Sequence, residues 1–265
     1  MNNLDILEQI LAAKRRAVKI ATEEIPLTQL SREAAGVRRS AQPHALVKAL
    51  RENTRLNIIA EFKRRSPSRG LIREQASISA IARDYESGGA AAISVLTEED
   101  YFAGSLGDLR AARQAVSLPI LRKDFIFEEY QVYESAAAGA DALLLIVAAL
   151  SDESLIKLRR LTEEDLGMDA LVEVHERDEM KRALASGAKL IGINNRNLKT
   201  FEVTLETSAE LARDLGKDVL LVSESGLHMR ADLQRLKALG FDGFLIGESL
   251  MRSERPAEAL RELWS

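Results

Sequence analysis

The feature of this sequence that most constrains its fold is an eightfold alternation of short apolar runs with amphipathic segments of helical character. The runs are almost continuously apolar, which is typical of strands buried on both faces of a parallel sheet. Eight such strands, each followed by a helix, predict an α/β fold of the (β/α)8 TIM-barrel type. The runs occupy residues 57–62, 91–96, 119–125, 140–147, 169–174, 189–194, 218–223 and 242–247.

The segments between the runs carry the marks of helices that end abruptly. Four of them end in a glycine just before the next run, in ESGGAAAIS, AAGADALLL, ASGAKLIGI and ALGFDGFLI, which indicates a left-handed residue at the helix end. We predict helices over 77–87, 151–161 and 229–239, with Ser151 or Asp152 as the N-cap of the second. The structural alternative is a doubly wound open sheet. Such sheets usually have fewer strands, and no Gly-x-Gly-x-x-Gly motif follows the first run.

We expect residues 1–265 to form a single barrel domain in which residues 1–50 are an N-terminal helical extension packed on the barrel. The segment Ser40–Pro43 looks like a break within that extension. Capping of the bottom or side of the barrel is the simplest role for it. A contribution to ligand binding is the alternative, because the chain enters the first strand directly from the extension.

Composition excludes several classes of function. The net charge of −4, with 29% charged residues, gives no electrostatic reason to expect nucleic acid or a membrane as a partner. The absence of cysteine excludes thiolate nucleophiles and thiolate metal sites, and the three histidines show no spacing that predicts a metal site. The N-terminus does not read as a secretory signal, and the longest apolar run, Ala142–Leu150, is too short to cross a bilayer. We therefore expect a cytoplasmic protein.

Polar residues follow six of the eight runs, at positions that face the active site in a TIM barrel. A single residue of this kind often forms only a salt bridge at the rim, but six strand ends together favour a functional site. Strand alternation places Glu61 and Lys63 on one face and Phe62 on the other. The residues in question are Glu61 and Lys63, Arg122–Asp124, Glu173 and His175, Asn194–Arg196, Ser223–Gly226 and Gly247–Ser249.

Two lysines and two glutamates that converge on one mouth indicate proton-transfer chemistry. A lysine beside another cation in a partly dry site loses proton affinity and can serve as a general acid near neutral pH. A glutamate facing apolar walls has a raised pKa and can serve as base or acid. We interpret the basic stretch Lys63–Arg69 as an active-site loop, since it lies inside the barrel pattern and lacks the interleaved aromatic residues of a nucleic-acid patch.

The last two strand ends predict a phosphate site. Ser225-Gly226 and Gly247-Glu248 each come before a predicted helix, so free backbone N–H groups at the helix starts would point into the mouth. The loops after strands 7 and 8 are the usual phosphate position in TIM barrels, and Ser66 in the loop after strand 1 adds a hydroxyl donor. The sequence thus favours an anionic, phosphorylated small molecule as the ligand.

The strand ends also resemble those of the indole-3-glycerol-phosphate synthase family. The resemblance covers every predicted strand end in order and extends to the N-terminal segment ILEQILAAKRRAV. The Lys-Arg-x-Ser-Pro-Ser loop together with Leu-Arg-Lys-Asp-Phe is highly specific. The matching blocks are IIAEFKRRSPSRG, SVLTEEDYFAGS, PILRKDFI, LLLIV, LVEVH, IGINNRNL, SESG and LIGESLM.

The resemblance implies a lyase of tryptophan biosynthesis, which converts 1-(2-carboxyphenylamino)-1-deoxyribulose 5-phosphate to indole-3-glycerol phosphate with release of CO2 and water, without cofactor or metal. By this resemblance Lys123 is the general acid and Glu173 the general base. Lys63 contacts the substrate carboxylate and is a second candidate proton donor, and Glu61 tunes it. The residues alone leave open which lysine acts in which step. The implied substrate-binding residues are Asn194 and Arg196 at the ribulose hydroxyls, Phe102, Phe125 and Leu144 around the aryl ring, Ser66, Ser225, Gly226, Gly247 and Glu248 at the phosphate, and Glu224 beside them.

Two rival functions fit the pattern less well. Phosphoribosylanthranilate isomerase is another phosphate-binding barrel, but its chemistry usually includes a cysteine, which this chain lacks. A non-catalytic barrel that only binds a phosphorylated ligand would have no need for Lys63, Lys123 and Glu173 at one mouth. We expect a monomer whose partner is a phosphorylated small molecule, and association with other enzymes of the pathway stays an open alternative.

Overall fold

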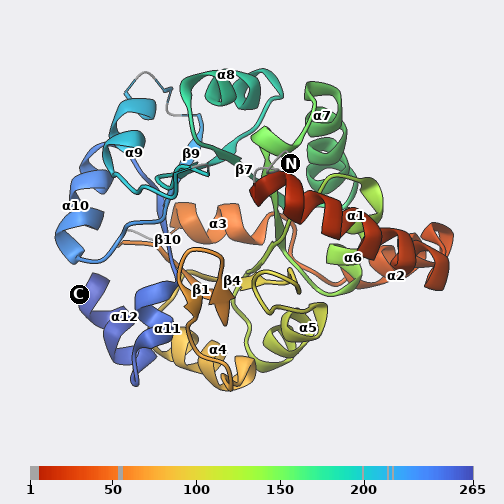
Figure 1. Cartoon of the computed structure of the whole chain (residues 1–265), viewed down its shortest axis with the longest axis horizontal. Helices are drawn as coiled ribbons and strands as arrows, with labels where there is room; N and C mark the ends of the chain where they lie inside the picture. The colour runs from red at the N-terminus through yellow and green to blue at the C-terminus, as the bar shows by residue number, and fades with distance from the viewer. Residues whose placement is uncertain (1–5, 53–55, 199, 214, 217, 265) are drawn as a thin grey trace, which may run out of the picture.

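The structure is a computed structural model that describes residues 6–52, 56–198, 200–213, 215–216 and 218–264. Eight parallel strands close into a barrel, because β1 pairs with both the second and the last strand (Figure 1). The prediction of a TIM barrel is confirmed, and the open-sheet alternative is wrong. The strands are β1 Ile58–Phe62, β4 Ala92–Leu96, β5 Ile120–Lys123, β6 Ala142–Ile146, β7 Asp169–Val174, β8 Leu190–Asn194, β9 Leu220–Glu224 and β10 Gly243–Ile246.

A ring of helices surrounds the barrel (Figure 1). Ser77 caps α4 and Ser151 caps α7, each by accepting a backbone N–H with its side chain. Of the two N-cap candidates for α7, Ser151 is therefore confirmed, and Asp152 is the first helical residue. The helices are α4 Ile78–Ser87, α5 Leu106–Ala115, α6 Glu129–Ala137, η1 Val147–Ala149, α7 Asp152–Arg160, η2 Leu161–Asp165, α8 Arg177–Ala185, α9 Glu206–Leu211, α10 Arg230–Ala238, α11 Glu248–Arg252 and α12 Pro256–Trp264.

The predicted glycines end their helices in the left-handed region. Gly89, Gly139, Gly187 and Gly240 have φ angles between 84° and 98°, where residues with a Cβ atom are strained. At Gly139 the space is restricted as well, since a Cβ atom there would lie 3.0 Å from Cγ of Arg113. These turns return the chain to the next strand within a few residues, as the sequence pattern predicts.

The N-terminal extension contributes three helices, α1 Ile6–Glu24, α2 Leu27–Arg38 and α3 Ala45–Glu52. Residues 1–5 of the predicted extension lie outside the described residues. Helix α2 packs along α6, and α3 lies across the barrel (Figure 1). Leu46 and Leu50 of α3 insert among the side chains of the barrel interior, while Asp169 at the start of β7 accepts the N–H groups of Leu46 and Val47. Helix α3 thus closes the end of the barrel at which the strands begin.

The strands are apolar throughout because both of their faces are buried. In β1, Ile58, Ala60 and Phe62 face the layer between barrel and helices, whereas Ile59 faces the barrel interior. Glu61 continues the interior face of β1, two residues beyond Ile59. The charged groups at the strand ends therefore extend the same interior column that carries the apolar core. Phe62 lies on the opposite face, as predicted.

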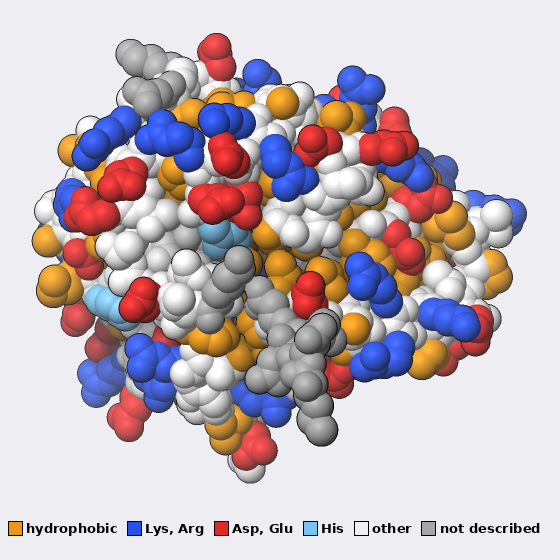
Figure 2. Space-filling view, turned by 45° about the horizontal axis from the view of Figure 1, so that its top comes forward, with side chains coloured by type: hydrophobic (Ala, Val, Ile, Leu, Met, Phe, Trp, Pro, Cys, Tyr) orange, Lys and Arg blue, Asp and Glu red, His pale blue; other side chains and the backbone are white. Residues whose placement is uncertain are grey.

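The basic stretch after β1 folds back as a short hairpin of β2 Arg65–Ser66 and β3 Gly70–Leu71. Arg64 anchors it by two hydrogen bonds of 2.7 Å to the carboxylate of Asp108. In the space-filling view, acidic and basic side chains are interspersed over the visible face (Figure 2). Among the described residues, no helix combines the length and apolar character needed to cross a membrane.

Candidate active site

A pocket opens where the barrel strands end, and it is lined by every residue to which the resemblance assigns a role, but not by Arg122, His175, Asn195 and Ser223 of the polar strand ends. The N-terminal extension, for which a contribution to ligand binding was the alternative, adds Ile6, Leu7 and Ile10 of α1 to the lining; the sequence did not single out these three residues. The confirmed lining residues are Glu61, Lys63, Ser66, Phe102, Lys123, Phe125, Leu144, Glu173, Asn194, Arg196, Glu224, Ser225, Gly226, Gly247 and Glu248. This placement shows that they meet at one mouth, while their individual roles stay predictions.

Lys123 lies at the centre of the pocket floor, between two carboxylates. Its Nζ atom is 3.0 Å from Oε2 of Glu173 and 2.9 Å from Oε2 of Glu224. Lys123 and Glu224 are the last residues of β5 and β9, Glu173 is the last but one of β7, and Glu61 on β1 completes a set from alternate strands of the barrel. Alternate strands of a TIM barrel contribute side chains to the same interior layer. The uppermost layer of this barrel is therefore charged, where the layers below are apolar.

The pKa shifts in this layer differ from the sequence expectation. Burial alone would lower the pKa of Lys123, but the charges of Glu173 and Glu224 outweigh it and raise that pKa far above its ordinary value. Burial alone would raise the pKa of Glu173, yet Lys123 and His175 hold it well below the ordinary range. The expected directions for Lys123 and Glu173 are thus wrong, because each has opposite charges as its nearest neighbours.

Glu224 is the carboxyl group of this layer whose pKa is raised by its surroundings. Burial and the neighbouring charge of Glu173 outweigh the attraction of Lys123 and raise the pKa of Glu224 to about 7. Its Oε1 atom is buried without a hydrogen-bond partner in the described part of the chain. A Cβ atom at Gly192 of β8 would lie 2.2 Å from that oxygen. Gly192 is a requirement of the site that sequence reasoning missed, since a glycine inside a strand does not by itself reveal what approaches it.

Glu61 and Lys63 form a second ion pair at the same level. Lys63 Nζ lies 2.6 Å from Oε1 of Glu61, so the two side chains share one face of the chain, as strand alternation predicts. Gly247 leaves the room for this carboxylate, because a Cβ atom there would lie 2.5 Å from the same oxygen. The interaction supports the expectation that Glu61 acts on Lys63.

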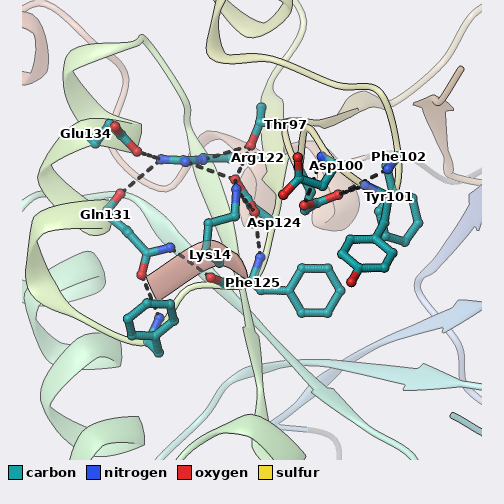
Figure 3. Close-up of polar contacts among 12 residues, drawn as sticks. Lys14, Thr97, Asp100, Tyr101, Phe102, Arg122, Asp124, Phe125, Gln131 and Glu134 are labelled. Atoms are coloured by element: carbon teal, nitrogen blue, oxygen red, sulfur yellow. Dashed lines mark hydrogen bonds and ion pairs between the residues drawn. The ribbon is translucent and has the colours of Figure 1, made fainter. Parts of the chain in front are cut away.

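One side of the pocket is apolar. The rings of Phe102 and Phe125 have centroids 6.1 Å apart and planes inclined by 39°, a separation typical of an interacting aromatic pair. The backbone N–H groups of Tyr101 and Phe102 donate to Oε2 of the buried Glu98, and that of Phe125 donates to Asp124 (Figure 3). Buried carboxylates therefore fix the two loops from which the rings project.

The neighbours of Lys123 support the site from behind. Arg122 contacts Asp124 at 3.0 Å and Glu134 at 2.8 Å, and Lys14 of α1 lies 2.8 Å from Asp124 (Figure 3). Burial acts against the charge of Asp124, but Arg122 and Lys14 lower its pKa to about 2. Of the polar run Arg122–Asp124, only Lys123 takes part in the charged layer; Arg122 and Asp124 form a salt bridge that is buried behind it and does not lie at the rim. Nothing in the sequence pairs Lys14 with Asp124.

The opposite side of the pocket carries the predicted phosphate loops. Gly247 is the N-cap of α11, as expected. Ser225 and Gly226 have φ angles of 67° and 77°, and α10 begins only at Arg230. The expectation that Ser225-Gly226 sits at a helix start is thus wrong, because left-handed residues cannot open a right-handed helix and the chain first makes a turn. A Cβ atom at Gly226 would lie 2.5 Å from Cγ1 of Val203.

Two arginines, Arg69 and Arg196, bring positive charge to this side of the pocket. Burial and the charge of Arg69 lower the pKa of Arg196, while Glu248 acts in the opposite sense, and Arg69 Nε lies 3.5 Å from Oε2 of Glu248. The sequence placed Arg69 in the basic loop without a role. Asn194 accepts the N–H of Arg196 with its side-chain oxygen and so orients the turn. Within the described residues, no group of three or more His, Asp and Glu side chains is placed to hold a metal ion.

Comparison with known proteins adds independent findings. A family model described as indole-3-glycerol phosphate synthase matches residues 7–263. A protein of that name from Desulfosudis oleivorans is 48% identical over 260 residues, which span 98% of this chain and 98% of that protein. One from Carboxydothermus hydrogenoformans is 46% identical over 261 residues, or 97% and 98% of the two chains.

Solved structures show the same fold at low sequence identity. KGPDC from Streptococcus mutans is 15% identical with a TM-score of 0.61 and covers 79% of this chain and 96% of its own. Thiamine phosphate pyrophosphorylase from Pyrococcus furiosus is 17% identical with a TM-score of 0.59 and covers 78% and 93%. At this level of identity the likeness concerns the barrel alone.

Proposed function

The chain belongs to the indole-3-glycerol phosphate synthase family, and we propose on that premise that its pocket closes the indole ring. The proposed substrate is 1-(2-carboxyphenylamino)-1-deoxyribulose 5-phosphate, and the products are indole-3-glycerol phosphate, CO2 and water. This places the protein in tryptophan biosynthesis as a carbon–carbon lyase. The single observation that carries the proposal is the position of Lys123, which donates to two carboxylates at the centre of a pocket with one apolar and one basic side.

The first step is a carbon–carbon bond formation. The arene carbon that bears the carboxylate attacks the ribulose carbonyl, and we assign Lys123 as the acid that protonates the carbonyl oxygen. Because its pKa is raised, Lys123 keeps its proton at neutral pH, so the ammonium form is present to stabilise the alkoxide as it develops. Loss of CO2 then restores the aromatic ring.

The second step is dehydration, in which a proton leaves the substrate and a hydroxyl group departs as water. We assign Glu173 as the base, since the lowered pKa of Glu173 keeps it ionised at working pH. We assign Lys63 to the substrate carboxylate, and it is the second candidate proton donor. Its ion pair with Glu61 supports a role for that glutamate in holding the lysine in place.

The two sides of the pocket fit the two ends of the substrate. We assign Phe102, Phe125 and Leu144 to the aryl group, because an aromatic pair and an apolar wall suit an uncharged ring. We assign the phosphate to the side with Arg196 and the loops after β9 and β10. The proposed phosphate donors are Ser66, Ser225, and the backbone N–H groups of Gly226, Gly247 and Glu248, and we assign Asn194 to the ribulose hydroxyls; all of them line the pocket.

The test is the appearance of indole fluorescence when the purified protein is incubated with the carboxyphenylamino substrate. No metal ion or nucleotide is added, and a parallel sample contains EDTA. We expect turnover that depends linearly on protein concentration and is unaffected by EDTA. Absence of turnover in a protein whose circular dichroism shows the folded barrel would overturn the proposal.

A further inference from the structure

His175 occupies a position that the proposed chemistry does not use. It follows β7 directly, two residues after Glu173, and its side chain is 11% exposed. Its Nδ1 atom lies 3.1 Å from Oε2 of Glu179 on α8, and its Nε2 atom lies 3.3 Å from Oε1 of Glu173. The imidazole ring is therefore inserted between two carboxylates, one on the outer helix and one in the charged layer of the pocket.

The protonation state of this ring follows from the acceptors around it. An ionised carboxylate only accepts, so Nδ1 must carry the hydrogen that faces Glu179. In a neutral ring Nε2 would then turn a lone pair toward Oε1 of Glu173, and two acceptors would oppose each other. Only the imidazolium ion offers a hydrogen to both sides. In agreement, burial would lower the pKa of His175, but the two carboxylates outweigh it and raise that pKa to about 10.

The same contacts divide the two oxygens of Glu173. Oε2 accepts the hydrogen bond from Lys123, whereas Oε1 faces His175. At 3.3 Å the contact with Nε2 is an ion pair without an aligned hydrogen bond, and Nε2 has no other hydrogen-bond partner among the described residues. The remaining charged groups around Glu173 are Glu224 on β9 and, through Lys123, Glu61 on β1.

We propose that His175 is a positioning residue for Glu173, in that its imidazolium ion engages Oε1 and so holds the carboxylate with Oε2 turned toward Lys123 and the reacting centre. This proposal rests on the proposed function, in which Glu173 is the base. His175 also keeps the base ionised, because it supplies a second positive charge when Lys123 is shared with Glu224. An alternating row of charges, Glu179, His175, Glu173 and Lys123, thus runs from the outer helix to the reacting centre.

A purely structural role for the ring is separable from this one. The carboxylate of Glu179 already ties α8 to the end of β7 through the backbone N–H of His175, at 2.7 Å. That bond survives any substitution of the side chain. Replacement of the imidazole therefore tests its action on Glu173 while the link between strand and helix stays in place.

The experiment compares His175→Asn and His175→Gln with wild type across pH 5.5 to 9. The shorter amide of the Asn variant reaches toward Glu179 and loses Glu173, whereas the Gln amide replaces Nε2 with an uncharged donor. The matched control is His44→Asn, at the opposite end of the barrel, where the side chain is 50% exposed. Asparagine tolerates the φ angle of 51° that His44 adopts.

We expect the acid limb of the kcat/KM profile to move to higher pH in His175→Asn. Loss of a neighbouring cation raises the pKa of Glu173, so the base form is lost at a higher pH. If that pKa rises to about one unit above the lowest pH assayed, kcat/KM falls roughly tenfold at the acid end, where wild type keeps the ionised base, and the plateau above pH 8 stays nearly unchanged. His175→Gln should shift less, because its amide still donates, and His44→Asn should match wild type. An equal loss at every pH in a folded variant would overturn the proposal.

Two further measurements test the same role of His175. If His175→Asn does not fold, Glu179→Gln leaves the ring in place but allows it to become neutral, and the acid limb should move in the same direction by less. Independently of turnover, 15N spectra of the three histidines identify His175 by the signal missing in the variant. That ring should stay doubly protonated at pH 8, and titration near its ordinary value would overturn the proposal. Turnover absent from wild type and His44→Asn alike would instead overturn the proposed function.

Discussion

Replacement of Lys123 by methionine tests the centre of the site most directly. The methionine side chain has a similar length, fills most of the space of the lysine stem and removes only the charge and its hydrogen bonds. Glu173 and Glu224, with side chains 3% and 2% exposed, would then face each other without the cation that both contact. The substitution therefore leaves two buried carboxylates in one small volume.

The expected loss of stability follows from this geometry. Removal of one partner from a buried ion pair costs about 3–5 kcal/mol, because an unpaired charge stays behind. Protonation relieves part of that cost, and Glu224, whose pKa is already raised to about 7, takes the proton first. We expect destabilisation of about 3 kcal/mol at pH 7.5. It should shrink as the pH falls toward 5.5, by up to about 1.4 kcal/mol per pH unit for each extra proton that the folded variant holds.

The assays are urea unfolding at pH 7.5 and 5.5 and steady-state kinetics with the carboxyphenylamino substrate. Loss of a general acid should lower kcat by at least about a thousandfold, while substrate affinity stays within about tenfold, or 1.4 kcal/mol. Lys181→Met, which removes an exposed lysine paired with Asp178, should leave turnover and the unfolding midpoint near wild type. A Lys123→Met variant with kcat within tenfold of wild type would refute the role of this lysine as the acid.

Three further changes probe the groups around that centre. Gly192→Ala places a methyl group 2.2 Å from Oε1 of Glu224. Displacement of the carboxylate should lower kcat at least about tenfold with little change in KM. An unchanged kcat would show that the position of this carboxylate does not matter for turnover. Phe102→Ala removes one ring of the aromatic pair and should raise KM about tenfold with kcat nearly unchanged. Phe102→Leu should bring KM most of the way back to the wild-type value. An effect confined to kcat would contradict a contact between Phe102 and the aryl group. The raised pKa of Glu224 makes the folded protein hold a proton that the unfolded chain releases, so the free energy of unfolding should fall as the pH rises from about 4.3 to about 7. In Glu224→Gln the urea midpoint should vary less with pH over this window. A pH dependence identical to that of wild type would exclude Glu224 as its source.

The fold was predictable because its signals are local and repeated. Each apolar run needs burial on both faces, and glycines such as Gly139 and Gly240 must adopt positive φ angles that the sequence can mark. The convergence of Glu61, Lys123 and Glu173 also follows from local rules, since alternation along each strand and the common end of parallel strands determine the face and the edge. The sequence therefore identifies which residues meet at the mouth.

What the sequence cannot supply is the identity of the nearest neighbour at that mouth. Lys123 was expected beside another cation, but its contacts are Glu173 and Glu224, and this reverses the direction of its pKa shift. The error has a physical origin, because a shift depends on distances of a few ångströms between strands that are about 50 and 100 residues apart. Gly192 escaped notice for the same reason, since the oxygen that requires it belongs to the adjacent strand.

The charged layer also shows how an active site can rest on an apolar core without loss of the fold. Glu61, Lys123, Glu173 and Glu224 occupy one level of the barrel interior, and three carboxylates against one ammonium ion would repel each other if left alone. Lys63 compensates at one edge through Glu61, and His175 compensates at the other through Glu173. An excess of negative charge remains in the layer, and it contributes to the raised pKa of Glu224. The proposed substrate brings its own carboxylate and phosphate and would add negative charge, so we expect its binding to depend on the cations at the edges of the layer as well as on Lys123.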